Sequence, residues 1–183
     1  MKKILVLGSA PGALIPADIE NYFVIAANAA IAPFPDLVPD VLILNGATLV
    51  GQRGIAPVSR EQLRGRSVRN LIVIDNHKDS KIAAIESGIN YRTIDFWTKE
   101  KRRDVCKLQS KITYPGLAGN DIPSTGVTAI CYALCFGVDV FVSGINVFSD
   151  GHSYGADRFK RGHIEWDTAT LRAVSGRYKE LSK

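Results

Sequence analysis

The sequence predicts an α/β fold in which helices cover both faces of a mostly parallel sheet, within a single domain spanning residues 1–183. Three observations lead to this prediction. Apolar runs of strand length recur along the chain, and helix-compatible or loop segments separate them. The runs are continuous rather than alternating, which is typical of strands buried on both faces. A length of 183 residues also suits one hydrophobic core.

The predicted strands are residues 3–7, 22–27, 41–44, 71–75, 91–96 and 138–143. Small or polar residues end most of these runs: Gly8-Ser9, Asn28, Asn45, Asp75-Asn76 and Gly144-Ile145-Asn146. Ligands bind outside the carboxyl ends of the strands in an open parallel sheet, so these residues mark the expected ligand edge. The repeated Asn therefore stands where a side-chain amide could contact a ligand.

Three segments fit helices: residues 80–87, 127–136 and 165–181. The second is apolar, which predicts a buried helix. The third is amphipathic, with Trp166 and Tyr178 on the face that should meet the sheet.

Two longer segments lack such patterns. Residues 46–60 contain many turn formers, which predicts loops around the site. Residues 97–121 have no clear assignment, which is typical of a lid or a disordered segment. The basic stretch 99–103 predicts a solvated helix face, with an acceptor- or donor-facing lid and a contact with anionic lipid headgroups as alternatives.

The composition, with 46% hydrophobic and 22% charged residues, is that of a soluble globular protein. No segment approaches the roughly 20 apolar residues that cross a bilayer, and the N-terminal apolar run is too short for a signal peptide. A formal net charge of +5 favours anionic ligands or membrane surfaces only weakly. The three cysteines lack metal-type spacing and indicate thiols in a reducing compartment. We expect a cytoplasmic protein, with membrane association as an alternative, that binds no nucleic acid.

A glycine turn follows the first predicted strand. Its sequence, Gly8-Ser9-Ala10-Pro11-Gly12, resembles the first turn of a nucleotide-binding fold but lacks the G-x-G-x-x-G spacing. Asn28 ends the second strand, where an ordinary NAD site carries an acidic residue. The chain also lacks the G-x-x-x-x-G-K-[ST] pattern of a P-loop. These observations argue against an ordinary NAD site and a P-loop.

The C-terminal third carries the most informative motifs. Pro123-Ser124-Thr125-Gly126 leads into the apolar segment 127–136, which places N–H groups and two hydroxyls at a helix N-terminus and favours an anion there. Gly151-His152-Ser153-Tyr154-Gly155 is predicted as a loop, and Gly162-His163-Ile164-Glu165 as the start of a helix. The two histidines, one in each motif, are candidates for proton transfer.

In this order the motifs resemble those of the sialyltransferases, both the vertebrate-type sialylmotif family and the bacterial lipooligosaccharide sialyltransferases. The resemblance implies a Rossmann-like sheet of the sialyltransferase-type GT-A variant. It implies three catalytic residues, with His163 as general base, Tyr154 as the hydrogen-bond donor to the leaving phosphate and His152 as its helper. The residues implied in donor binding are Ser9, Asn28, Asn45, Ser124, Thr125 and Gly126.

The resemblance further implies an inverting glycosyltransferase that moves sialic acid or a related ulosonic acid from a CMP-sugar donor to a glycan hydroxyl. No metal or other cofactor is expected, because no D-x-D signature accompanies the motifs. A CMP-sugar hydrolase, another nucleotide-using transferase and a non-catalytic nucleotide-sugar binding module are the alternatives. Phe148 supports the last, because it replaces a second Tyr of the bacterial group and cannot donate a hydrogen bond.

Overall fold

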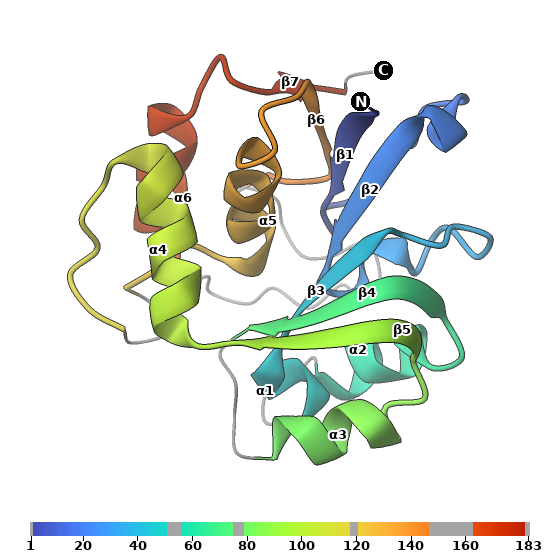
Figure 1. The fold of residues 1–183 in the computed structure, drawn as a ribbon. Coiled ribbons are helices and arrows are strands. Elements are labelled where there is room, and N and C mark those ends of the chain that lie inside the picture. Colours follow the sequence, from blue (N-terminus) through green and yellow to red (C-terminus); the bar gives the residue numbers. More distant parts are fainter. Residues whose placement is uncertain (1, 51–55, 75–78, 118–120, 147–162, 182–183) are drawn as a thin grey trace.

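The computed structural model describes residues 2–50, 56–74, 79–117, 121–146 and 163–181. Its centre is one parallel sheet with the strand order β5-β4-β3-β2-β1-β6-β7 (Figure 1). The strands are β1 (Lys3–Leu7), β2 (Tyr22–Ala27), β3 (Val41–Asn45), β4 (Ser67–Ile74), β5 (Asn90–Trp97), β6 (Val140–Ser143) and β7 (Lys179–Glu180). The prediction of a parallel sheet from continuous apolar runs is therefore confirmed.

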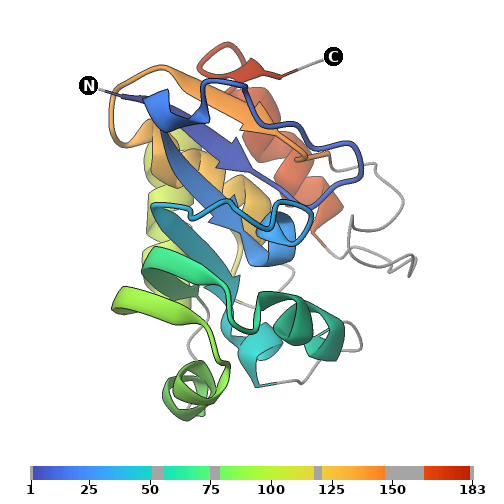
Figure 2. The ribbon, with the colours of Figure 1, turned by 90° about the vertical axis from the view of Figure 1, so that its right-hand side faces the viewer.

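Helices cover both faces of this sheet, as predicted (Figures 1 and 2). They are α1 (Gly46–Leu49), α2 (Ala56–Leu63), α3 (Ser80–Glu86), α4 (Lys99–Ser110), α5 (Thr125–Leu134) and α6 (Ile164–Ala173), with 3-10 turns η1 (Ile19–Asn21) and η2 (Asn28–Ile31). Helix α5 packs directly on one face, with α4 and α6 beside it, and η2, α1, α2 and α3 lie on the other. None of the helices in the described ranges is long and apolar enough to span a membrane.

Alternate residues of the central strands enter two separate cores. On β1, Ile4 and Val6 contact the core under α5, whereas Leu7 contacts the core under α2 and α3. On β3, Ile43 contacts the core under α5 and Leu44 contacts the core under α2 and α3. Both faces of a strand are thus buried, which explains why the apolar runs are continuous.

The segment 97–121 contains helix α4, so the expectation of a disordered segment is wrong for residues 99–110. Thr98 caps the helix, and its Oγ1 accepts a hydrogen bond from the amide of Lys101 at 3.3 Å. The buried stripe of α4 consists of Arg102, Cys106 and Ser110. Because two of these three residues are polar, the stripe gives little hydrophobic signal in the sequence.

Two other expectations for helices and loops are also corrected. Residues 46–60 are not all loop, because α1 begins directly after β3 and α2 begins at Ala56. The C-terminal helix ends at Ala173 instead of continuing to residue 181. The chain then turns through Gly176, whose φ of +80° suits glycine, and pairs as β7 with β6.

The aromatic side chains of the C-terminal segment have different environments. Trp166 packs edge-on against Tyr114, with ring centroids 5.8 Å apart, in a small cluster with Cys106 and Cys131. It therefore faces α4 and α5 rather than the sheet, contrary to expectation. Tyr178 packs against the core that includes the sheet strands, as expected.

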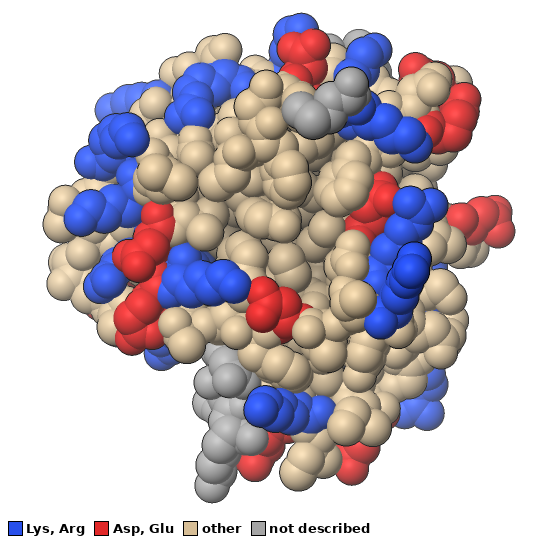
Figure 3. Space-filling model, viewed as in Figure 1, with Lys and Arg blue, Asp and Glu red and all other residues tan. Residues whose placement is uncertain are grey.

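Helix α4 presents basic side chains to solvent (Figure 3), where Lys and Arg gather along the left side of the view. We call the five basic residues of α4 and its C-cap that are not buried the basic face of α4: Lys99, Lys101, Arg103, Lys107 and Lys111. Two exposed acidic residues, Glu100 and Asp104, lie among them, and Asp104 forms an ion pair with Arg103 at 3.3 Å. Near the middle of this face, Leu108 is 57% exposed. The expectation of a solvated helix face holds for these residues but fails for Arg102, which is 1% exposed.

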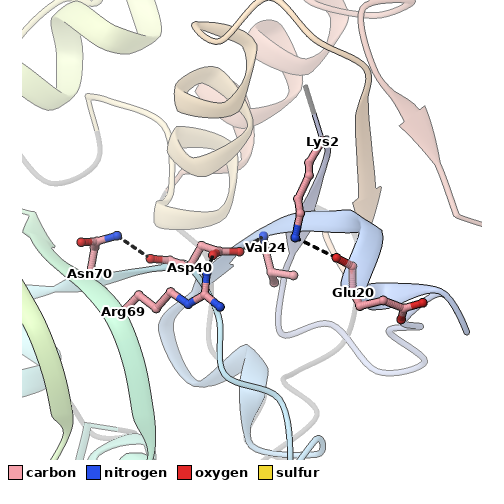
Figure 4. A network of polar contacts seen from close by, with 6 residues as sticks. All are labelled: Lys2, Glu20, Val24, Asp40, Arg69 and Asn70. Carbon is pink, nitrogen blue, oxygen red and sulfur yellow. Dashed lines mark hydrogen bonds and ion pairs between the residues drawn. The ribbon is translucent and has the colours of Figure 1, made fainter.

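A polar network joins β2, β3 and β4 near their amino ends (Figure 4). The carboxylate of Asp40 accepts hydrogen bonds from the amide of Val24 at 2.8 Å and from Nη1 of Arg69 at 2.7 Å. Its main-chain carbonyl accepts from Nδ2 of Asn70 at 2.8 Å. These contacts fix the edge of the sheet opposite to the carboxyl ends of the strands.

Candidate functional site

The strand order creates a topological switch point between β1 and β6. From β1 the chain builds β2 to β5 on one side, and it later adds β6 and β7 on the other. In open parallel sheets, ligands bind at the carboxyl ends of the strands beside such a point. The residues that follow β1 and β6 are therefore the first place to look for a site.

Two glycines bring the ends of β1 and β6 into direct contact. The amide of Gly8 donates to the carbonyl of Ser143 at 2.8 Å, and the amide of Ala10 donates to the carbonyl of Gly144 at 2.8 Å. A Cβ placed on Gly8 would lie 2.3 Å from the oxygen of Gly144, so no larger residue fits without movement. Gly144 also has a φ of +67°, a conformation that L side chains rarely adopt. Ser9, half-buried, follows Gly8 at this crossing.

Asn28 and Asn45 lie side by side at the ends of β2 and β3. Oδ1 of Asn28 accepts a hydrogen bond from the amide of Asn45 at 3.4 Å, and Asn28 has a φ of +52°. Oδ1 of Asn45 accepts from the amide of Ala47 at 2.9 Å and caps α1. The oxygen of Asn45 is thus engaged in capping, so a hydrogen bond from this side chain to a ligand would come from Nδ2.

The Ser124–Gly126 turn lies at the same edge of the sheet. Ser124 is the N-cap of α5, and its Oγ accepts from the amide of Val127 at 3.4 Å. A Cβ placed on Gly126 would lie 3.6 Å from Cδ1 of Ile145, which follows Gly144. The end of β6 therefore connects the turn before α5 to the end of β1. Amides in the first turn of a helix have no carbonyl partner within that helix, which makes those of Thr125 and Gly126 potential anion donors.

His163 stands beside this turn as the N-cap residue of α6. Its Nδ1 lies 2.9 Å from the carbonyl oxygen of Ile122, two residues before Ser124. A carbonyl can only accept, so this contact requires the proton on Nδ1 and, in the neutral ring, the lone pair on Nε2. In its neutral form, the imidazole therefore takes the tautomer that a general base acting through Nε2 requires.

Asp167 is a buried carboxylate at the same place. It is 3% exposed, and its Oδ1 accepts a hydrogen bond from the amide of Ser124 at 2.6 Å. Burial raises the pKa of Asp167, although the hydrogen bonds from Ser124 and the charges of His163 and Arg102 act in the opposite direction. Glu165, the acidic residue of the motif that contains His163, has an exposed side chain. A spacing of four residues from His163, which places two side chains on one helix face, could have identified Asp167.

Arg102 of α4 completes this cluster. Its Nε donates to Oγ1 of Thr128 at 3.2 Å, and its Nη2 donates to the carbonyl of Pro123. Sequence reasoning missed it, because a single arginine within a run of charged residues gives no sign that it is buried.

The loop residues His152 and Tyr154, together with Phe148, lie outside the described residues. Within the described ranges, no group of three or more His, Cys, Asp or Glu side chains could hold a metal ion. Comparisons with protein family models, with curated proteins and with solved structures found no match. The features that bear on function therefore lie at the carboxyl edge of the sheet: helix-terminal amides, side-chain amides and an oriented imidazole.

Proposed function

We propose that this protein is a glycosyltransferase that moves sialic acid or a related ulosonic acid from a CMP-sugar to a glycan hydroxyl, with inversion and without a metal. The observation that carries the proposal is the convergence at the switch point. One edge of the sheet carries the ends of four strands, β1, β2, β3 and β6. The turn before α5 and the imidazole of His163 lie along the same edge. Nucleotide-binding α/β proteins place their ligands at this edge.

The donor would lie across this edge with its anionic groups toward α5. Free N–H groups and the helix dipole stabilise negative charge at a helix N-terminus. The amide of Ser124 already bonds to the carboxylate of Asp167, so the amides of Thr125 and Gly126 are the donors that we assign to the ligand. The side chains of Ser9, Asn28 and Asn45 would contact the cytidine monophosphate part.

Transfer requires removal of a proton from the attacking hydroxyl and stabilisation of the departing phosphate. We assign the first role to Nε2 of His163, whose tautomer the bond to Ile122 selects. For the second role we assign the first-turn amides of α5, with Tyr154 as a further donor and His152 as its helper, on the resemblance of their motif.

Ligand-induced thermal stabilisation tests the donor assignment. A ligand at 100 times its Kd stabilises the native state by about 2.7 kcal/mol. For a domain of this length that raises the melting temperature by roughly 5–10 °C. CMP should do this, and a CMP-sugar more strongly, whereas UDP and NAD should not. A preference for UDP or NAD would contradict the assignment.

Product analysis tests the chemistry. His163→Ala should lower transfer by ~10²–10⁴ while CMP affinity stays within a few fold, because a general base acts mainly on the barrier. Addition of EDTA should leave transfer unchanged. Release of CMP without a glycosylated product would indicate a hydrolase, and binding without release would indicate a nucleotide-sugar binding module.

A further inference from the structure

Three successive residues before α5 have their main-chain groups held by side chains from other helices. The carbonyl of Ile122 contacts Nδ1 of His163 at 2.9 Å. The carbonyl of Pro123 accepts from Arg102 of α4, which is 1% exposed. The amide of Ser124 donates to Asp167 of α6 at 2.6 Å. The turn that leads into α5 is therefore fixed residue by residue from α4 and α6.

We propose that Asp167 is the positioning residue of this site, holding the turn before α5 and the imidazole of His163 at a fixed separation. Asp167 and His163 share the first turn of α6, where the amide of Asp167 donates to the carbonyl of His163 at 2.8 Å. Through its carboxylate, Asp167 also holds Ser124. One residue thus connects the proposed base to the proposed donor-binding turn, so the inference rests on the proposed function.

The charge of Asp167 is unfavourable for folding, which argues for a role other than stability. Burial raises the pKa of Asp167 in the folded protein. Below the unfolded-state pKa the carboxyl is protonated and carries no cost, and the free energy of unfolding falls as the pH rises through the folded-state pKa. A neutral isostere should therefore fold at least as well at neutral pH. A buried carboxylate bonded to the turn before α5 and one helical turn from His163 fits a residue that acts on a neighbouring base.

The groups that face this carboxylate come from three elements. They are the imidazole of His163 on α6, the guanidinium of Arg102 and the thiol of Cys106 on α4, and the amide and hydroxyl of Ser124 before α5. His163 and Arg102 can carry positive charge, and both favour the ionised form of Asp167. Conversely, ionised Asp167 favours a proton on His163, which is the state that a general base reaches during transfer.

The decisive variant is Asp167→Asn, which keeps the shape and one acceptor for Ser124 but removes the charge. Its matched control is Glu165→Gln, the same change on an exposed side chain in the same turn of α6. Asp167→Asn should melt at or above the wild-type temperature at pH 7. Its kcat should fall by roughly 10–100-fold, with donor KM within a few fold, because the proton that His163 gains during transfer is no longer stabilised by a neighbouring negative charge. The acid limb of its pH–rate profile should move to lower pH, whereas Glu165→Gln should match wild type in all three measurements.

A ligand-free measurement separates this inference from the proposed function. In wild-type protein, NMR titration should show the Ser124 amide and the His163 ring resonances shifting with the same midpoint as the Asp167 carboxyl carbon. This result would support the positioning role even if no CMP-sugar is turned over, which would overturn only the proposed function. Because the NMR titration uses wild-type protein, it still tests the positioning role if Asp167→Asn does not fold. Absence of a shared midpoint, or loss of melting temperature and activity in Asp167→Asn with an unmoved pH profile, would overturn the inference.

Discussion

The contact between Gly8 and Gly144 makes a sharp prediction about the switch point. A Cβ on Gly144 would lie 2.5 Å from the oxygen of Gly8 and 2.6 Å from Cβ of Ala13, and the residue has a φ of +67°. The left-handed conformation costs an L residue about 1–2 kcal/mol. Overpacking against main-chain atoms costs a further ~1–3 kcal/mol. Gly144→Ala should therefore lower the free energy of unfolding by about 2–5 kcal/mol.

Two other glycines separate these contributions. Gly137 has a φ of +66°, and its added Cβ would meet nothing within 4 Å, so Gly137→Ala measures the conformational cost alone, about 1–2 kcal/mol. Gly8 has no unusual φ, but its Cβ would lie 2.3 Å from the Gly144 oxygen and from Cγ1 of Ile145. Gly8→Ala therefore measures the steric cost, ~1–3 kcal/mol.

Urea unfolding followed by tryptophan fluorescence gives the three free energies. A CMP thermal-shift assay on the same variants then tests the site. Gly8→Ala and Gly144→Ala should weaken CMP binding, because they separate the ends of β1 and β6, whereas Gly137→Ala should not. If Gly144→Ala costs no more than Gly137→Ala, the close approach of the two strand ends does not exist and the site geometry built on it is wrong.

Three further predictions concern other parts of the molecule. Asp40→Ala should lower the free energy of unfolding in urea by about 1–3 kcal/mol, because it leaves the buried Val24 amide without its acceptor. The control Arg69→Gln, on a side chain 67% exposed, should cost under about 1 kcal/mol. Under native conditions a thiol reagent should modify the exposed Cys135 at once, whereas the buried Cys106 and Cys131 should react only on unfolding. Immediate reaction of all three cysteines would contradict the packing of α4 on α5. If the basic face of α4 binds anionic lipid, the protein should sediment with phosphatidylglycerol vesicles but not with phosphatidylcholine vesicles. The double variant Lys107→Glu, Lys111→Glu should not sediment, because each lysine lost removes about 1 kcal/mol of binding free energy. Equal sedimentation of wild type and variant would exclude this face.

The sequence predicts the sheet well because burial on both faces leaves a direct pattern. The strands 3–7 and 22–27 have the predicted bounds. Asn28 and Asn45 follow two of the predicted strands, and the structure joins them by a hydrogen bond. Elements that depend on tertiary contacts were missed. Helix α4 buries a polar stripe, and α6 stops where the chain leaves to add β7, a pairing that no local pattern encodes.

Some residues of the candidate site could be predicted from the sequence, and others could not. Ser124 and His163 carry recognisable motifs, and the structure places both at the switch-point edge. Asp167 and Arg102 were not predicted, because their importance comes from burial and from hydrogen bonds to main-chain groups 43 and 21 residues away. Such contacts follow from the packing of three helices and leave no periodic signal in the sequence.

Energetically costly features of this fold gather at the carboxyl edge of the sheet. Asn28 has positive φ there, and Asp167 and Arg102 are buried beside it. At the amino edge, by contrast, the carboxylate of Asp40 is paired with the amide of Val24 and with the exposed side chain of Arg69. Lys111, the other described non-glycine residue with positive φ, simply ends α4. Folding alone does not require strained backbone and buried charge together at one edge, whereas a binding site requires fixed backbone and preorganised charge. The occurrence of a left-handed Asn28 and of buried Asp167 and Arg102 at one edge therefore supports placing the site at the ends of β1, β2, β3 and β6.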